Sequence, residues 1–151
     1  MSTASTPAGF EGTTPILRVR SLAASIDYYT NVLGFKVEWG QGTSFACVRR
    51  DRASLFLCEG DQGNVGSWVW LGVTDVAKLH AEYIAKGASI RHPPTNYEWA
   101  CEMQVADPDG NVLRCGSESL PDQPIGEWLD MRGDRWVRKT EGDGWMRLER
   151  G

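Results

Sequence analysis

Two segments of this chain follow the same plan, in which a short strand leads into a capped amphipathic helix that ends at a glycine. The expected strand, cap and closing glycine are residues 14–19, Ser21 and Gly34 in the first segment and residues 67–73, Thr74 and Gly87 in the second. The two caps and the two glycines are each 53 residues apart. This internal repeat predicts one supersecondary unit built twice.

The helices of both segments are predicted to bury one apolar face. The expected buried residues are Leu22, Ile26, Tyr29 and Leu33 in the first helix and Val76, Leu79, Tyr83 and Ile84 in the second. Each helix is followed by three strand-like runs, at residues 36–39, 43–50 and 53–58 and then at residues 89–92, 99–106 and 111–117. We therefore expect an α+β fold of two βαβββ modules, whose open sheet faces enclose a cleft.

The chain divides into three expected parts. Residues 1–12 read as a flexible leader, residues 13–118 as the two-module domain, and residues 119–151 as a C-terminal β extension. In the extension, Trp128, Trp136 and Trp145 recur in short segments separated by Gly-Asp turns, which predicts a small β-meander. Two roles stay open for it: a lid or dimer clasp, or a flap that covers an exposed sheet edge.

Composition excludes several classes of function. A net charge of −4 argues against nucleic-acid binding, which needs a basic surface, and mildly favours a cationic ligand. No apolar run approaches the roughly 20 residues that cross a bilayer, and the leader lacks the pattern of a signal peptide. We expect a soluble cytoplasmic protein that contacts neither membrane nor nucleic acid. The four cysteines form no CxxC pair and are expected to be buried thiols.

Two sequence motifs resemble those of a known protein family. The helix sequence at residues 25–35 (SIDYYTNVLGF) and the turn at residues 107–111 (DPDGN) resemble the vicinal oxygen chelate superfamily, which holds glyoxalase I, extradiol dioxygenases, fosfomycin-resistance enzymes and bleomycin-resistance proteins. The resemblance covers residues 13–118. Within this superfamily the chain is most similar to the bleomycin-binding proteins, through residues 67–70 (SWVW) and through Trp99 with Glu102. That similarity implies a homodimer whose aromatic side chains stack on a drug.

The enzymes of this superfamily hold a divalent metal with His and Glu side chains from four strands. The corresponding positions in this chain are Thr14, Phe56, Trp68 and Arg114. None of these is a plausible ligand, and Arg114 would repel the ion. The two histidines, His80 in a helix and His92 in the predicted loop at residues 92–98, lie off the strand walls. We therefore expect no metal, no cofactor and no catalytic residue, although the question of enzymatic activity stays open.

Strand alternation assigns the cleft-facing side chains of the strands expected at residues 14–19, 53–58, 67–73 and 111–117, and the resemblance adds Trp99 and Glu102. The candidate ligand-binding residues are Trp99, Trp68, Trp70, Phe56, Arg114, Arg18, Thr14 and Glu102. Such a surface suits a flat, partly polar molecule held by stacking, although the two arginines are equally able to pair with Glu102. The leading hypothesis is a metal-free binding protein that sequesters a bulky aromatic antibiotic of the bleomycin type. The alternatives are an enzyme with an atypical metal site or none, acting on a small metabolite, and a binding module for another metabolite or a protein.

Overall fold

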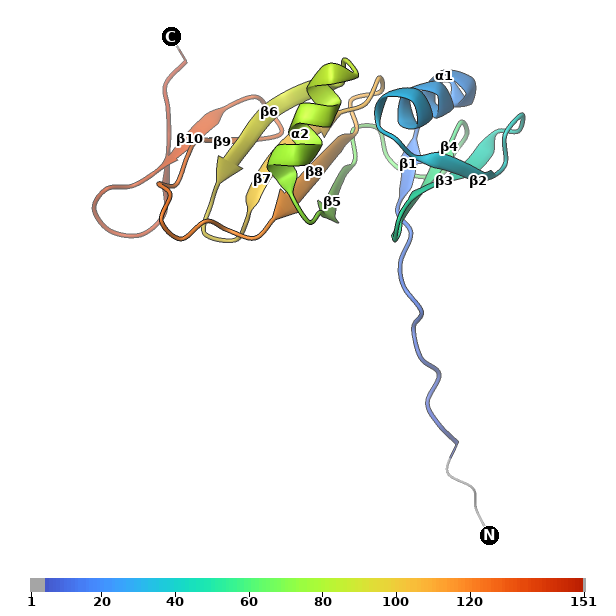
Figure 1. The fold of residues 1–151 in the computed structure, drawn as a ribbon, viewed down its shortest axis with the longest axis horizontal. Helices are drawn as coiled ribbons and strands as arrows, with labels where there is room; N and C mark the ends of the chain where they lie inside the picture. The colour runs from blue at the N-terminus through green and yellow to red at the C-terminus, as the bar shows by residue number, and fades with distance from the viewer. Residues whose placement is uncertain (1–4, 151) are drawn as a thin grey trace.

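The computed structural model describes residues 5–150. Of the predicted leader, residues 5–12 are exposed and form neither helix nor strand, and they run away from the first strand in Figure 1. Residues 1–4 of the leader lie outside the described residues. No helix in the described part of the chain has the length and apolar character needed to span a membrane.

Two βαβββ modules form an α+β fold, as the repeat predicted. The first comprises β1 (Ile16–Arg18), α1 (Leu22–Asp27), the π-helical segment η1 (Tyr28–Val32), β2 (Lys36–Trp39), β3 (Phe45–Arg50) and β4 (Ala53–Cys58). The second comprises β5 (Trp68–Gly72), α2 (Val76–Ala85), β6 (Ser89–Asn96), β7 (Cys101–Ala106) and β8 (Val112–Ser117). Their sheets have equivalent strand orders, β1-β4-β3-β2 and β5-β8-β7-β6, and the first-named pair of each is parallel. The repeat in sequence is therefore a repeat in topology.

The distance from the helix cap to the closing glycine is one residue longer in the first module than in the second, which corrects the predicted repeat. Ser21 caps α1 as expected, because its hydroxyl accepts a hydrogen bond from the Ala24 N–H. The cap of α2 is Asp75 instead of Thr74, since the Asp75 carboxylate accepts from the Lys78 N–H. The first helix therefore has one more residue before its closing glycine. The π-helical segment η1 accommodates this residue in a wider turn, in which the Leu33 N–H donates to the Tyr28 carbonyl over 3.0 Å.

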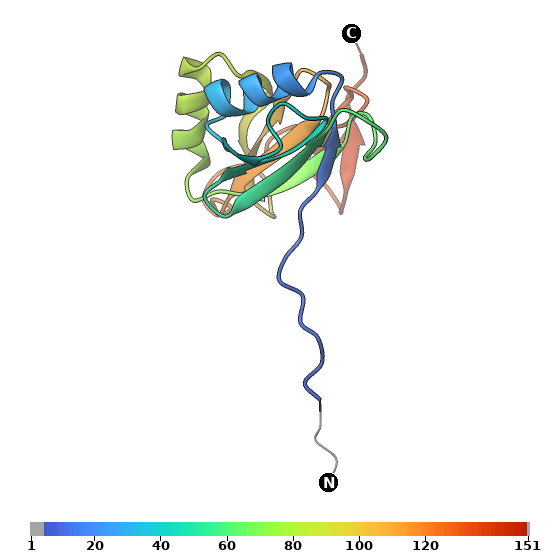
Figure 2. The same cartoon turned by 90° about the vertical axis from the view of Figure 1, so that its right-hand side faces the viewer.

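The core lies on the helix-bearing face of both sheets. The predicted burial of Ile84 is wrong, because this side chain is 57% exposed. Leu79 is partly buried, and the other residues predicted for the two helix faces are buried. Strand alternation is confirmed for β1 and β4: Leu17 and Leu57 are fully buried against the helices. Both helices lie on the same side of the molecule (Figure 2), and one contiguous apolar cluster joins the two modules. The opposite face of each sheet is left for other contacts.

The predicted loop at residues 92–98 is wrong over most of its length. Strand β6 continues through Pro93 and Pro94 as far as Asn96. Proline is tolerated there because β6 is the edge strand of its sheet and its register with β7 shifts between His92 and Thr95. His92 therefore lies on a strand, where burial lowers the pKa of its imidazole and Nδ1 lies 3.2 Å from the Thr95 hydroxyl.

The turn at residues 107–111 ties the modules together. Asp107 accepts hydrogen bonds from the backbone N–H groups of Asp109 and Asn111, at 2.8 and 2.9 Å, and from the Tyr29 hydroxyl of the first module. The fully buried Asn111 side chain donates to the Arg18 carbonyl at the end of β1 and accepts from the Ser67 N–H at the start of β5. These contacts explain the turn motif by structure alone.

An ion pair forms a second link between the modules. The Arg50 guanidinium contacts the Glu82 carboxylate of α2 through two hydrogen bonds of 2.6 and 2.9 Å and also donates to the Leu33 carbonyl. Arg50 belongs to the basic run at residues 49–52 around the β3–β4 turn, and its side chain reaches across to α2.

The C-terminal extension forms the predicted β-meander, with β9 (Trp128–Leu129), β10 (Arg135–Arg138) and β11 (Trp145–Arg147) in the order β11-β10-β9. It borders the edge strand β6, where the Gly126 N–H donates to the Asn96 carbonyl, and it also reaches inward over the sheet. Trp128 lies under the guanidinium of Arg114, which belongs to the central strand β8, and the Leu129 carbonyl accepts from the Gln104 side chain of β7. The extension therefore covers the open face of the second sheet.

We expect Asn111→Ala to be strongly destabilising, because the Ser67 N–H and the Arg18 carbonyl would each lose a partner inside the protein. A buried group left without a partner costs about 1–3 kcal/mol, so the free energy of unfolding should fall by roughly 3 kcal/mol or more. Urea denaturation measures this change. The matched control is Asn31→Ala on the exposed side of η1, for which a change below about 0.5 kcal/mol is expected. Equal losses in the two variants would contradict the bridging role of Asn111.

The Arg50–Glu82 link predicts a pH dependence. The hydrogen bonds from Arg50 hold the pKa of Glu82 below its ordinary value. A carboxyl whose pKa is lower in the folded state stabilises the fold above the unfolded-state pKa, and this contribution disappears as the pH falls through the folded-state pKa. Glu82→Gln should therefore lower the melting temperature at pH 7 and leave it near the wild-type value in acid. A difference that persists at low pH would show that the side chain acts through packing alone.

Candidate functional site

A buried ion pair lies at the centre of the open face of the second sheet. Glu102 on β7 and Arg114 on β8 point to this face, and the carboxylate accepts from Arg114 Nε at 2.9 Å and from Nη2 at 2.8 Å. The Glu102 side chain is 1% exposed, whereas that of Arg114 is 28% exposed. Hydrogen bonding to Glu102 raises the pKa of the Arg114 guanidinium. The sequence left open whether Arg114 pairs with Glu102 or meets a ligand, and the structure forms the pair.

Aromatic rings enclose this pair. The Arg114 guanidinium lies over the rings of Trp70 and Trp128, with its carbon 5.3 and 4.9 Å from their centroids. Trp99 stacks on Tyr97 at a centroid distance of 4.8 Å and an interplanar angle of 5°, and its indole N–H donates to Glu102. The predicted residues Trp70, Trp99, Glu102 and Arg114 are thus joined in one network.

A pocket of about 410 Å³ opens above this network. We call it the tryptophan pocket, and its lining residues are Trp99, Arg114, Trp128, Trp136 and Trp145. The ring of Trp99 is the shared element: Trp128 meets it edge-on at 6.0 Å, and Trp145 is tilted against it at the same distance. The indole rings therefore face the same pocket at different angles.

Local hydrogen bonds hold the extension's tryptophans in place. The Tyr97 hydroxyl donates to the Glu127 carbonyl directly before Trp128, over 2.6 Å. The Asp130 carboxylate accepts from the Trp136 indole N–H at 2.9 Å and from two backbone N–H groups of its own turn. This indole bond is the main cause that lowers the pKa of Asp130. The Gly-Asp turn thus positions an aromatic wall.

Trp70 depends on a neighbouring glycine. Its six-membered ring lies so close to Gly116 on β8 that a Cβ atom at residue 116 would collide with it. The absence of a side chain at residue 116 allows the indole to lie across the sheet, where it meets the Arg114 guanidinium. Trp68, two residues earlier, meets Trp128 at a centroid distance of 6.2 Å and has the Arg91 guanidinium 5.1 Å from its ring centroid.

The remaining predicted residues lie on the first module. Phe56 forms a compact group with Trp39 and Phe45, at centroid distances of 5.3–5.9 Å, which we call the aromatic triad. Arg18 pairs with no carboxylate in residues 5–150, and its Nε is a buried atom without a hydrogen-bond partner. Neither residue lines the tryptophan pocket. The structure therefore divides the predicted site between two sheets, since the extension covers only the second.

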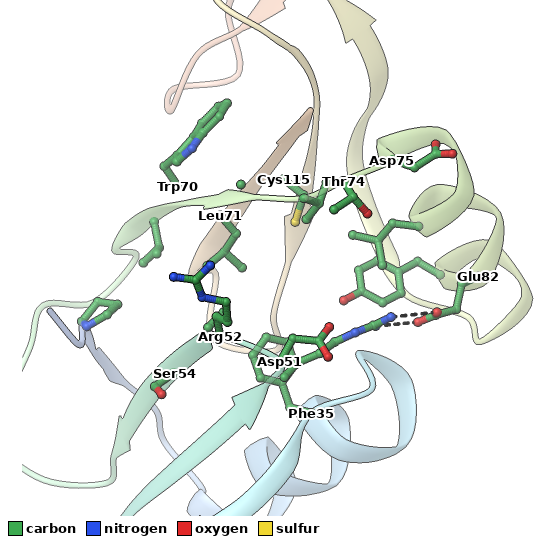
Figure 3. A pocket seen from close by; sticks show the side chains of 18 of the residues that line it. Phe35, Asp51, Arg52, Ser54, Trp70, Leu71, Thr74, Asp75, Glu82 and Cys115 are labelled. Carbon is green, nitrogen blue, oxygen red and sulfur yellow. Dashed lines mark hydrogen bonds and ion pairs between the residues drawn. The ribbon is translucent and has the colours of Figure 1, made fainter. Parts of the chain in front are cut away.

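A larger groove of about 1070 Å³ lies between the modules (Figure 3). It runs between edge strand β5, the start of α2 and the β3–β4 turn, and Thr14, Trp68 and Trp70 border it. The cleft was expected between two open sheet faces, whereas this groove lies where the two modules meet, and the extension lies over the open face of the second sheet. The Arg50–Glu82 ion pair is drawn at the side of the groove in Figure 3.

The chemistry-bearing side chains do not gather into a metal set. Within residues 5–150, no three His, Cys, Asp or Glu side chains are arranged to hold an ion. The four cysteines are buried free thiols. Burial raises the pKa of Cys47, Cys101 and Cys115, that of Cys115 to about 12, so these three thiols remain protonated at neutral pH.

Sequence reasoning missed most of the pocket wall. It placed Trp128, Trp136 and Trp145 in a meander without assigning them to the site, and it left out Tyr97, Arg91 and Gly116. The pairing of the meander strands links two of these tryptophans to one surface. Trp136 lies opposite Trp128 across β10 and β9, so their side chains share one face of the meander. What that face covers was not readable from the chain.

Comparisons with known proteins identify solved structures that are similar to this chain. A comparison with curated proteins finds no match. Among solved structures, the bleomycin-binding protein from bleomycin-producing Streptomyces verticillus, complexed with copper(II)-bleomycin, is 26% identical with a TM-score of 0.63 over 75% of this chain and 100% of that one. The antibiotic-binding protein TnmS3 from Streptomyces sp. CB03234 is 21% identical, with a TM-score of 0.63 over 75% of this chain and 100% of that one. TioX from Micromonospora sp. ML1 is 20% identical, with a TM-score of 0.60 over 72% of this chain and 100% of its own.

A family model also matches, over residues 12–114. This range contains both modules as far as Arg114, and the three tryptophans of the extension lie outside it. The chain therefore belongs to the Glyoxalase/Bleomycin resistance protein/Dioxygenase superfamily.

Proposed function

We propose that this protein binds and sequesters a bulky aromatic antibiotic of the bleomycin type, whose flat aromatic part enters the tryptophan pocket. The observation that carries the proposal is the convergence of four indole rings and one guanidinium on a single space of about 410 Å³. Flat aromatic molecules gain stacking energy on such rings in addition to the burial of apolar area. Binding of this kind needs neither a metal nor a nucleophile.

The relationship to a bleomycin-binding protein supports the proposal. That protein is 26% identical, and the match spans its whole length. The aligned share of this chain is 75%, which leaves room for an addition of its own. Trp99 and Arg114 belong to the family segment, whereas Trp128, Trp136 and Trp145 follow it. We infer that the extension adapts a family binding surface to a particular ligand.

The proposal includes a homodimer, as the similarity to the bleomycin-binding group implies. The aromatic triad supports it, because Trp39 is 47% exposed and its ring stacks on Phe45 at an interplanar angle of 16° on a sheet face that the extension does not cover. An exposed aromatic cluster of this kind is typical of an association surface. Sedimentation equilibrium should give twice the mass of one chain. The cytoplasmic location expected from the sequence remains part of the proposal.

The direct test is an isothermal titration of metal-free and copper-loaded bleomycin into the purified protein, with a metal assay on the same sample. We expect saturable binding near one drug molecule per chain and no dependence on a metal bound to the protein. Absence of heat with both forms of the drug would exclude bleomycin as the ligand.

A matched pair of variants locates the site. Trp99 and Trp39 are both 47% exposed, but only Trp99 lines the tryptophan pocket. Trp99→Leu should weaken drug binding by about tenfold or more, since it removes a stacking surface worth roughly 1.4 kcal/mol. Trp39→Leu should leave the dissociation constant within about twofold of wild type. A comparable loss in the two variants would contradict a site confined to the tryptophan pocket.

A further inference from the structure

Arg114 presents a free donor to the tryptophan pocket. Its Nε and Nη2 are both bonded to Glu102, and its guanidinium plane is held over the rings of Trp70 and Trp128. In a planar guanidinium, this arrangement leaves Nη1 directed away from the carboxylate. Nη1 has no hydrogen-bond partner within residues 5–150, and it is not among the buried unpaired atoms of that range. Its N–H groups are therefore accessible, on a residue that lines the pocket.

The side chains that line the pocket contain donors and ring faces but no acceptor. An indole has only an N–H donor, and a guanidinium has only donors. The Trp99 and Trp136 N–H groups are already bonded, to Glu102 and Asp130 respectively. Behind the wall, the Glu102 carboxylate is 1% exposed and engaged by Arg114 and Trp99, and the Asp130 carboxylate is bonded to the Trp136 indole and to its own turn. A ligand that enters with donor groups alone finds no side-chain partner in this lining.

The buried ion pair also polarises the pocket. The Glu102 side chain is 1% exposed and that of Arg114 is 28% exposed, so the accessible end of the pair is the cationic one. Tryptophan faces attract cations in general. Here the face of Trp128 is already occupied by the Arg114 guanidinium at 4.9 Å, and that charge opposes a second cation at the same place. The local charge therefore opposes the weak preference for cations expected from the net charge of −4.

We propose that the tryptophan pocket selects planar aromatic molecules that carry a hydrogen-bond acceptor on the ring edge, such as a carboxylate or a conjugated carbonyl oxygen, and that Arg114 Nη1 is the donor that recognises it. This inference rests on the proposed function and makes it more specific. Glu102 acts as a positioning residue, since its two bonds to Arg114 fix the direction in which Nη1 points.

The test uses three planar probes that differ only in the edge group: pyrenecarboxylate, pyrenemethanol and pyrenemethylammonium. Affinities for the full-length protein are measured by fluorescence anisotropy at neutral pH. We expect the carboxylate to bind at least about tenfold more tightly than the ammonium, with the alcohol between them. In the double variant Glu102→Gln/Arg114→Met, which removes both charges and leaves none buried alone, the carboxylate and the ammonium should bind within about twofold of each other.

A second variant guards against misfolding of the first. Arg114→Lys keeps the positive charge beside Glu102 but replaces the three guanidinium nitrogens with a single ammonium nitrogen, which has no separate group in the place of Nη1. The preference for the carboxylate should therefore fall while circular dichroism stays unchanged. Arg18→Met, which removes the unpaired arginine outside the pocket, is the control and should keep the full wild-type preference.

The outcomes separate this inference from the proposed function. Equal affinity of wild type for the carboxylate and the ammonium, or a preference that survives in both Arg114 variants, overturns the role of Arg114 while aromatic binding stands. If no probe binds and bleomycin gives no heat, both the inference and the proposed function are overturned. Loss of binding in Trp99→Leu together with loss of the preference in the Arg114 variants supports both.

Discussion

The turn at residues 107–111, in which Asp107 and Asn111 are buried, is the constraint on which the rest of the structure depends. Asn111 is fully buried and bonds to the end of β1 and to the residue before β5, so one side chain holds the two modules in register. Asp107 also accepts a hydrogen bond from the Tyr29 hydroxyl of the first helix. Because these groups are inaccessible to water, each depends on its protein partner. The turn motif that marks the family is thus a joint between modules.

The same turn sets the direction of every residue that follows it. Strand β8 begins at Val112, and the period of two then sends Leu113 and Cys115 into the core and Arg114 to the open face. Glu102 reaches Arg114 from the adjacent strand β7. A buried carboxylate is costly unless it is paired and hydrogen-bonded. Here three donor groups, two from Arg114 and one from Trp99, satisfy it, and the ion pair becomes a fixed floor for the pocket.

The extension turns this floor into an enclosed site. Its contacts run to strands β6, β7 and β8 through Arg91, Gln104 and Arg114, so it borders the edge strand β6 and also spans the sheet. Its tryptophans add walls that the family segment lacks, while the first sheet keeps its aromatic triad uncovered. One open face is thereby specialised for a small ligand, and the other is left for a different contact.

Much of the fold was predictable from local sequence. The repeat predicted two βαβββ modules, and strands β2 and β4 begin and end where the pattern placed them. The misplacements are local. Thr74, 53 residues after Ser21, was expected as the cap of the second helix, but the cap is Asp75; the π-turn in the first helix changes the spacing by one residue.

The site was predictable only in part. Sequence alone determined which residues share a sheet face, because alternation along a strand is a local property of the backbone. It therefore identified Trp70 and Arg114 together, and the family resemblance added Glu102. It did not determine what lies on top of that face. The position of Trp128 and Trp145 over Trp99, and the separation of Phe56 and Arg18 from them, come from packing between segments distant in the chain. No short-range pattern encodes such contacts, since they depend on how the whole extension folds back across the sheet.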